Sequence, residues 1–248
     1  MARHRFQSIP EPVPEIYRGA WRRDYIRRAN GVFDNLTQCW WLQAERYHID
    51  LRVPSDRPQV ANAQSLEQLD AAAREAFDRQ TAWVGLTEVT GDRCQWWPDA
   101  ALPGLSDEPD IGLMRFESDD ELIETCPDGR YVERWVRSGT IRDRCVAVRL
   151  KAEGTSIDAT LTIIVTGNLG GAALDVAGKP LEVSIAQATE QGLWRVLRAS
   201  LPWTEGEPAD SNTVPHPCEQ WLQHLARRQE SGAVDLIAGE ITHWRILD

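Results

Sequence analysis

Polar and apolar residues alternate over many short stretches of this chain, and such alternation predicts β-strands that bury one face. The alternation is cleanest between residues 46 and 53. One face of that stretch carries Tyr47, Ile49, Leu51 and Val53, and the other carries His48, Asp50 and Arg52. Similar stretches bounded by turn residues predict further strands in the first 138 residues, at 18–27, 36–43, 83–89, 93–97, 111–117, 122–125 and 131–137.

Eight antiparallel strands with short turns are the number that closes a barrel just wide enough for side chains or one small ligand. The second half repeats the pattern over shorter stretches, at 144–151, 158–166, 173–176, 181–185, 192–199, 234–237 and 240–247. The stretch 192–199 also fits a helix, because Leu193, Val196 and Leu197 have helical spacing. We therefore predict a mainly β chain, with an eight-stranded antiparallel barrel over 1–138 and a second, smaller β-barrel or sheet domain over 139–248.

Two segments have helical periodicity. Ser65 and Gln68 form a capping-box pattern ahead of apolar residues spaced three and four apart, which predicts a helix over 65–79. A second helix is predicted over 217–228. Residues 98–109 are rich in proline and acid, and are predicted to form a loop.

The pattern does not fix which face of strand 46–53 lines the barrel, because a shift of one residue exchanges the two faces. In the ordinary arrangement the apolar face fills the barrel and the polar face meets solvent. In the alternative, the polar face points inward and meets residues of neighbouring strands, namely Glu124, Tyr131 and Glu133. A buried Asp50 or Glu133 would then need Arg52 as an ion-pair partner. Burial in an apolar cavity would also raise the pKa of such a carboxylate, which could then act as a general acid or base. His48 would be another base near neutral pH.

The chain has eleven tryptophans, and two adjacent pairs fall on predicted strands. In Trp40–Trp41 and in Trp96–Trp97, one ring must point into the barrel and the other out of it. An inward ring fills the core or lines a pocket. An outward ring needs another surface to cover it, which predicts a packed second domain or a homodimer.

The composition indicates which classes of partner and which cellular compartment to expect. A net charge of −11 repels a phosphate backbone, so we expect no nucleic-acid partner. No apolar run is long enough to span a bilayer and none follows the charged N-terminus, so we expect no membrane association and a cytoplasmic location. Five cysteines, an odd number without a CxxC pair, predict reduced thiols.

The familiar catalytic signatures are absent from the sequence, including GxSxG, the P-loop, HExxH and the dinucleotide fingerprint. The nearest approach to a set of metal ligands is His216, Cys218 and His224. Cys218 and His224 are six residues apart and do not share a helix face well. We expect neither a metal nor a cofactor.

The sequence Gly19-Ala20-Trp21, near the start of the first predicted strand, resembles the GxW signature of lipocalins and the wider calycin superfamily. By this resemblance Arg134 or Arg137, on the last strand of the barrel, would pack on Trp21. A tandem of two calycin-like barrels also resembles a little-characterised family of fungal and bacterial two-barrel proteins. The resemblance implies a fold and no activity. Classical lipocalins are secreted and disulfide-bonded, and this chain departs from them on both counts.

The function we expect is that of a cytoplasmic lipocalin-like protein that binds a small, partly apolar molecule in a tryptophan-lined barrel cavity. One alternative is a cofactor-free lyase, isomerase or cyclase that uses acid–base carboxylates in the same cavity. Another is a structural or interaction module whose barrel is filled by its own side chains. The candidate ligand-binding residues are Trp21, Trp41, His48, Asp50, Arg52, Trp96, Glu124, Tyr131, Glu133 and Trp135.

Overall fold

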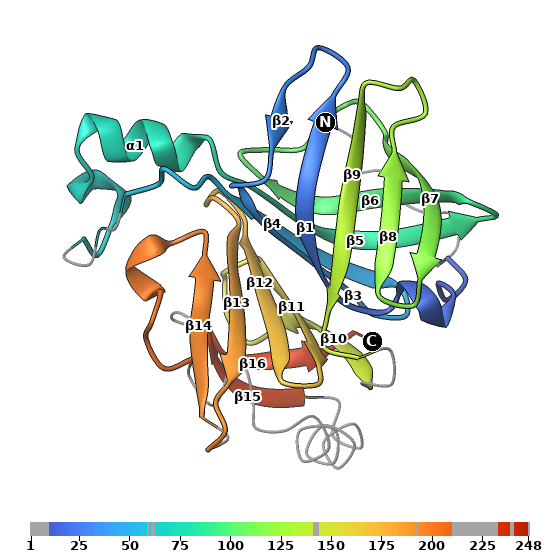
Figure 1. The fold of residues 1–248 in the computed structure, drawn as a ribbon. Helices are drawn as coiled ribbons and strands as arrows, with labels where there is room; N and C mark the ends of the chain where they lie inside the picture. The colour runs from blue at the N-terminus through green and yellow to red at the C-terminus, as the bar shows by residue number, and fades with distance from the viewer. Residues whose placement is uncertain are drawn as a thin grey trace.

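The computed structural model describes residues 10–58, 60, 63–140, 144–191, 193–209, 233–238 and 241–247. The helix predicted over 217–228, and the His216, Cys218 and His224 group, lie outside these residues. The chain is mainly β, with a closed eight-stranded barrel and a second, smaller sheet, as the sequence predicted (Figure 1).

The barrel is antiparallel throughout, and its strands follow one another in chain order. They are β1 Gly19–Arg28, β3 Gln38–Gln43, β4 Tyr47–Val53, β5 Thr81–Thr90, β6 Arg93–Leu102, β7 Asp110–Ser118, β8 Glu121–Thr125 and β9 Tyr131–Ser138. Pairing of β1 with β9, from Ala20 opposite Ser138 to Arg28 opposite Tyr131, closes the circle. A two-residue strand, β2 (Phe33–Asp34), lies beside the far end of β1.

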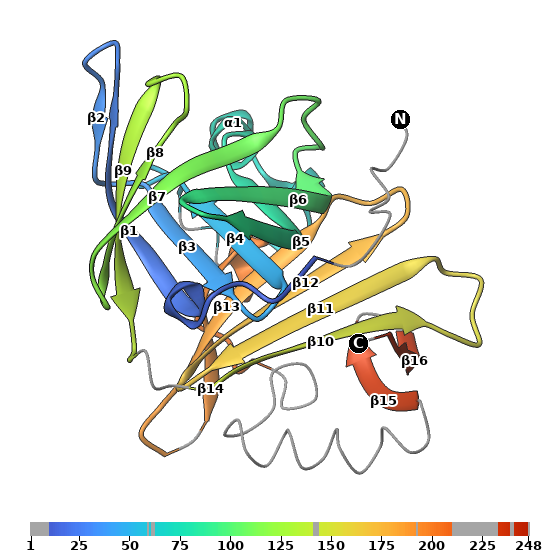
Figure 2. The same ribbon diagram turned by 90° about the vertical axis from the view of Figure 1, so that its right-hand side faces the viewer.

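The second sheet is open and has seven strands, in the order β14-β13-β12-β11-β10-β16-β15. Its strands are β10 Cys145–Ala152, β11 Ala159–Thr166, β12 Leu169–Val176, β13 Glu182–Ala188, β14 Trp194–Ala199, β15 Ala233–Ala238 and β16 Ile241–Ile246. The segment 192–199, which fitted either structure, contains strand β14. Figure 2 shows β11 and β12 crossing beneath the barrel strands β3 and β4.

The predicted loop 98–109 is wrong at its beginning, because β6 continues through Pro98 to Leu102. Proline is tolerated in a strand where its missing N–H is not needed by a neighbour. Strand β7 pairs with β6 only up to Trp96 opposite Asp110, so the second half of β6 is bound by β5 alone among the described strands. Residues 103–109 form the loop that returns to β7.

The first helix is shorter than predicted, and a different residue caps it. Helix α1 spans Ala71–Asp78, and the Asp70 side chain accepts a hydrogen bond from the N–H of Ala73 at 2.8 Å. Residues 66–68 form a 3₁₀ turn, and the Ser65 side chain makes no capping hydrogen bond. Aspartate is as good a cap as serine and precedes a run of alanines, the strongest helix formers, so the helix starts there.

The apolar face of β4 packs against the second sheet and does not fill the barrel. Ile49 and Leu51 are fully buried in a cluster that includes Ile164 of β11 and Ile185 of β13. The ordinary arrangement, with this face inside the barrel, is therefore wrong. The second sheet offers an apolar partner for the outer wall of the barrel, so the residues that need burial point outward here.

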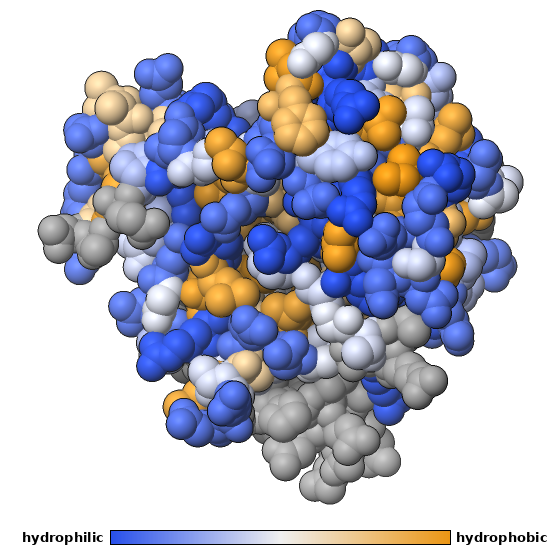
Figure 3. Space-filling model, viewed as in Figure 1, coloured by the Kyte–Doolittle hydropathy of each residue, from blue (hydrophilic) through white to orange (hydrophobic). Residues whose placement is uncertain are grey.

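Close packing and charged contacts join the two sheets. At Gly171 in β12, a Cβ atom would lie 3.2 Å from Leu42 Cδ2 of β3, so no larger side chain fits without a shift. Arg149 of β10 pairs with Asp99 of β6 at 2.5 Å. Apolar side chains are visible at the junction between the barrel and the second sheet, whereas polar ones cover most of the face in Figure 3.

The outward rings of the two tryptophan pairs belong to the same junction. Trp40 is part of the buried cluster, and Trp97 packs against it. The second sheet supplies the covering surface that these rings were predicted to need. Burial of the two rings is therefore explained without a homodimer.

The segment that joins β4 to α1 is also attached to the second sheet. The guanidinium of Arg57 donates to Gln80 Oε1, to the carbonyl of Ala199 at 2.7 Å and to Glu205 Oε1. The Arg57 and Glu205 side chains are both almost completely buried. Within the described residues, no helix has the length and apolar character needed to cross a membrane.

Candidate functional site

The closed end of the barrel is sealed by a short 3₁₀ turn at Glu15–Tyr17 and by an arginine on the last strand. The Arg137 guanidinium carbon lies 4.1 Å from the centre of the Trp21 ring. Its terminal nitrogens donate to the carbonyls of Arg18 at 2.5 Å and Ile16 at 2.8 Å. The indole N–H of Trp21 donates to the carbonyl of Tyr17 at 2.8 Å. Of the two arginines that the resemblance offered, Arg137 is the one that packs on Trp21.

Above this seal the barrel is filled by its own aromatic side chains. Trp41 stacks on Trp21 at 6.1 Å between ring centres and meets Trp96 and Trp135 edge-on at 5.6 and 5.8 Å. Trp21, Trp41 and Trp135 are at most 1% exposed. These three rings form the floor of the barrel interior.

His48 lies in the same interior and is held as a neutral ring. The Gln43 amide nitrogen donates to the carbonyls of Ala44 and Tyr47, which leaves its oxygen as an acceptor for the Thr87 hydroxyl at 2.8 Å. Thr87 has then used its proton, so His48 Nδ1, at 3.0 Å, must be the donor to it. Burial lowers the pKa of His48 to about 3. Its Nε2 atom has no hydrogen-bond partner among the described residues.

A layer of ion pairs lies above the tryptophans. Glu133 Oε1 accepts from Arg23 at 2.7 Å and from Arg52 at 3.5 Å. Arg52 also binds Asp50 at 3.1 Å, and Arg23 binds Asp34 at 3.0 Å. The Arg52 guanidinium carbon lies 4.8 Å from the centre of the Trp83 ring. Each guanidinium is therefore shared between two carboxylates.

Two further carboxyl groups lie near this layer, and both have raised pKa values. Glu124 accepts from the Tyr131 hydroxyl and from the Trp135 indole N–H, each at 3.0 Å. Burial, assisted by the charges of Glu133 and Asp110, raises the pKa of Glu124 to about 8. Burial likewise raises the pKa of Asp110 to about 6. Of the two carboxyl groups, Glu124 therefore holds its proton to the higher pH.

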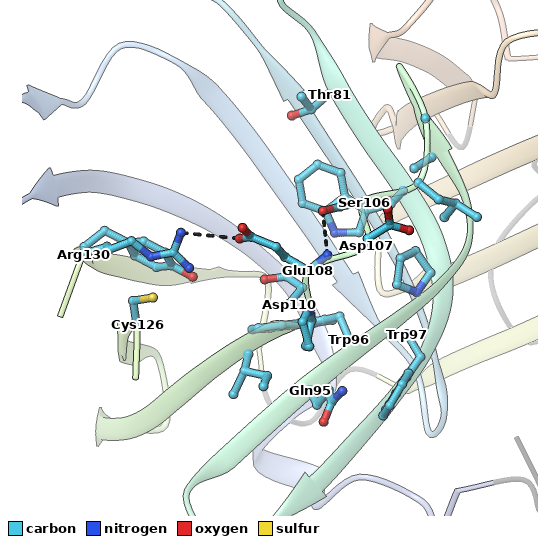
Figure 4. Close-up of a pocket in the computed structure, with 18 of the residues that line it drawn as sticks. Thr81, Gln95, Trp96, Trp97, Ser106, Asp107, Glu108, Asp110, Cys126 and Arg130 are labelled. Atoms are coloured by element: carbon cyan, nitrogen blue, oxygen red, sulfur yellow. Dashed lines mark hydrogen bonds and ion pairs between the residues drawn. The ribbon is translucent and has the colours of Figure 1, made fainter. Parts of the chain in front are cut away.

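A cavity of about 640 Å³ opens above these groups, at the point where β6 and β7 separate (Figure 4). Its wall combines β5, the second half of β6, the loop 103–109 and the turn that precedes β9. Four aromatic side chains contribute to it, namely Trp83, Trp96, Trp97 and Tyr131. The ion pair of Arg130 with Glu108 stands at one side of this wall (Figure 4).

The structure brings all ten predicted residues together in the barrel interior and separates them by depth. Trp96 and Tyr131 are on the cavity wall. Asp50, Arg52, Glu124 and Glu133 form the charged and polar layer behind it. Trp21, Trp41, His48 and Trp135 are deeper, where the barrel is packed.

Sequence reasoning missed several residues of the cavity wall, chief among them Trp83, Trp97 and Asp110. Asp110 fell between the predicted loop 98–109 and the predicted strand 111–117, whereas in the structure it is the first residue of β7. One signal was present for Trp83, since its alternation with Ala82 and Val84 places it on the opposite face from those apolar residues.

No family model matches the chain, and no curated protein matches it. Among solved structures, the chain is similar to the uncharacterized protein YLR301w from Saccharomyces cerevisiae. The two have 12% sequence identity and a TM-score of 0.55, and the match covers 92% of this chain and 97% of that one. The similarity is one of fold over almost the whole length of both chains.

Proposed function

We propose that the protein binds a small, partly apolar molecule in this cavity, in the manner of a calycin-like barrel. The observation that carries the proposal is the cavity itself, about 640 Å³ in volume and walled by four aromatic side chains. That volume is within the range of drug-sized ligand sites. The packed tryptophans beneath it restrict a ligand to the open end of the barrel.

The calycin-like assignment is supported by the closed end of the barrel. A 3₁₀ turn precedes β1, and Arg137 covers Trp21 while it binds the backbone of that turn. This is the role that the GxW resemblance implied for a late arginine. A cytoplasmic location is also part of the proposal, supported by Cys39, Cys94, Cys126 and Cys145, none of which forms a disulfide.

Binding is favoured over the two alternative functions by the position of the polar groups. Glu124, the carboxyl group whose pKa rises to about 8, is held by Tyr131 and Trp135 and is not part of the cavity wall. An acid–base catalyst would need such groups in contact with its substrate. Among the carboxyl groups of the described wall, only Asp110 has a raised pKa, so no second carboxyl of this kind stands beside it there. A barrel filled entirely by its own side chains would not leave this volume at its open end.

The test is native mass spectrometry of the protein purified from its expression host, with a denatured sample for comparison. We expect a retained small molecule that is released on denaturation. In the Ala101→Trp variant a large ring would occupy the cavity wall, and we expect the molecule to be lost. Ala72→Trp, on the exposed side of α1, is the matched control and should retain it.

A folded Ala101→Trp variant that carries the same molecule as the wild type would show that the ligand binds elsewhere. If both proteins are free of ligand, soaking them with a mixed library of small apolar compounds repeats the comparison. Failure of every compound to bind the wild type would then refute the proposal.

A further inference from the structure

The wall of the cavity carries more acid than base. Its charged side chains are Asp99, Asp107, Glu108, Asp110, Asp128, Arg28 and Arg130. Asp99 is paired with Arg149, and Arg130 is shared by Glu108 at 3.5 Å and Asp128 at 2.6 Å. Within the part of the chain that the structure describes, Asp107 and Asp110 have no basic side chain within 4 Å. The wall therefore has unpaired negative charge at its inner end, at Asp110.

The layer behind the wall supplies only part of the missing positive charge: Arg52 acts on Asp110 from a distance and lowers its pKa, while Asp50 and Glu133 of the same layer raise it. Arg23 and Arg52 are the guanidiniums there, and they are divided among Asp34, Asp50 and Glu133. The second oxygen of Glu133 is buried and has no hydrogen-bond partner among the described residues. Glu133 is two residues beyond Tyr131 on the same face of β9, so it is the next inward side chain below the cavity wall.

The aromatic groups of the wall suit a cation as well as an apolar body. The faces of tryptophan and tyrosine rings carry partial negative charge and attract ammonium and guanidinium groups. The Trp83 ring already receives Arg52 at 4.8 Å from within the barrel. Trp96 pairs directly with Asp110 across β6 and β7, so an aromatic ring and a carboxylate are adjacent at the inner end of the cavity.

We propose that the ligand is an organic cation, an ammonium group on an apolar body, with the ammonium beside Asp110 and the body against Trp83 and Trp96. This inference rests on the proposed function and names its ligand class. An anionic ligand would find one arginine neutralised by two carboxylates and the other, Arg28, exposed at the rim. A neutral ligand would bury Asp110 further without giving it a partner, which is costly.

The test is isothermal titration calorimetry at about pH 7.5 with three probes of similar shape: 4-phenylbutylamine, 4-phenylbutanol and 4-phenylbutyrate. The amine is protonated at this pH, the alcohol is neutral and the acid is ionised. A charge-assisted hydrogen bond in a partly buried site strengthens binding, so we expect the amine to bind about tenfold more tightly than the alcohol. The carboxylate should bind most weakly.

Asp110→Asn is the variant that isolates the charge, and its melting temperature shows whether it folds. We expect it to remove most of the amine's advantage and to leave alcohol binding within about twofold of the wild-type value. Glu75→Gln, on the exposed side of α1, makes the same change in net charge away from the cavity and should leave all three affinities unchanged.

The outcomes separate the two proposals. Equal binding of amine and alcohol, or stronger binding of the carboxylate, would overturn the cation inference and leave the binding cavity intact. An amine preference that survives in Asp110→Asn would also overturn it. Failure of all three probes to bind the folded wild type would count against both the ligand class and the binding function.

Discussion

Arg137 and Trp21 form the closure of the barrel's narrow end. The guanidinium carbon of Arg137 lies 4.1 Å from the centre of the Trp21 ring, and both of its terminal nitrogens bind backbone carbonyls of the segment that precedes β1. The Trp21 indole binds the same segment through Tyr17. Ring and guanidinium together fix the turn Glu15–Tyr17 across the end of the barrel, below the packed tryptophans.

Removal of this arginine should destabilise the whole barrel. Arg137→Ala leaves the carbonyls of Ile16 and Arg18 without their donor and uncovers Trp21, and we expect a loss of about 2–4 kcal/mol in the free energy of unfolding. Arg134→Ala, on the same strand, removes an arginine whose ion pairs with Asp24 and Glu121 are partly exposed, and should cost less than about 1 kcal/mol. Urea unfolding at neutral pH measures both losses of stability. Equal losses would show that the contacts of Arg137 with Trp21 and the turn stabilise the barrel no more than an exposed ion pair does.

The raised pKa of Glu124 should make stability fall as the pH rises. Its pKa is about 8 in the folded protein and 4.5 ordinarily, so between these values the folded state holds a proton that the unfolded state has lost. The loss on going from about pH 5 to pH 8 is on the order of 3 kcal/mol. In Glu124→Gln, which stays neutral and can bind both Tyr131 and Trp135, the decline should be much smaller. Unfolding curves at both pH values for each protein check this, and parallel declines would contradict it.

His48 should limit stability at the acid end. Its pKa is about 3 in the folded protein and 6.5 ordinarily, so between these values the unfolded state binds a proton that the buried ring does not. This contribution is complete above about pH 6.5 and is lost as the pH falls. His48→Asn keeps a donor for Thr87 and cannot take up the proton. Although the smaller side chain lowers stability at every pH, we expect the variant to lose about 2–3 kcal/mol less than the wild type between about pH 6.5 and pH 4.5. Thermal unfolding at these two pH values provides the comparison.

The buried ion pair between Arg57 and Glu205 should matter far more than its exposed neighbour. Arg57→Ala leaves the buried Glu205 with only the longer contact to Arg198 at 3.7 Å, and we expect a loss of about 3 kcal/mol. Arg79→Ala breaks a pair with Asp56 in which both side chains are at least 50% exposed, and should leave stability almost unchanged. Chemical denaturation compares the two. The double variant Arg57→Ala with Glu205→Leu should recover part of the loss, because the buried carboxylate that has lost its closer cation is then removed.

The strand pattern of the barrel was predictable because alternation and turn residues are local properties. The orientation of β4 was not, because the two faces of residues 46–53 are distinguished only by what each one meets. The apolar face packs against Ile164 and Ile185, which lie more than a hundred residues further along the chain. The sequence alone does not show where the sheet that carries them is placed against the barrel. The inward set of His48, Asp50 and Arg52 was foreseen as an alternative and not as the expected arrangement.

The cavity wall was harder to foresee for a related reason. It exists because β7 stops pairing with β6 at Trp96, which is a matter of register between strands. Residues 98–109 carry prolines and acids that fit a loop, and the strand within them is held by β5 alone among the described strands. Trp96 and Tyr131 were found because they lie on strands with clear alternation. Asp110 was missed because it lies between the predicted loop 98–109 and the predicted strand 111–117, where no pattern indicated its side-chain direction.

The junction between the barrel and the second sheet has a consequence for how this protein can change over evolutionary time. The outer wall at β3 and β4 is apolar, and a larger side chain at Gly171 beneath it would require Leu42 to shift. A recombination event that transferred the barrel to another chain would expose Ile49 and Leu51 to water and favour self-association. The two halves are therefore expected to be inherited together, with substitutions on one side of the junction matched by changes on the other.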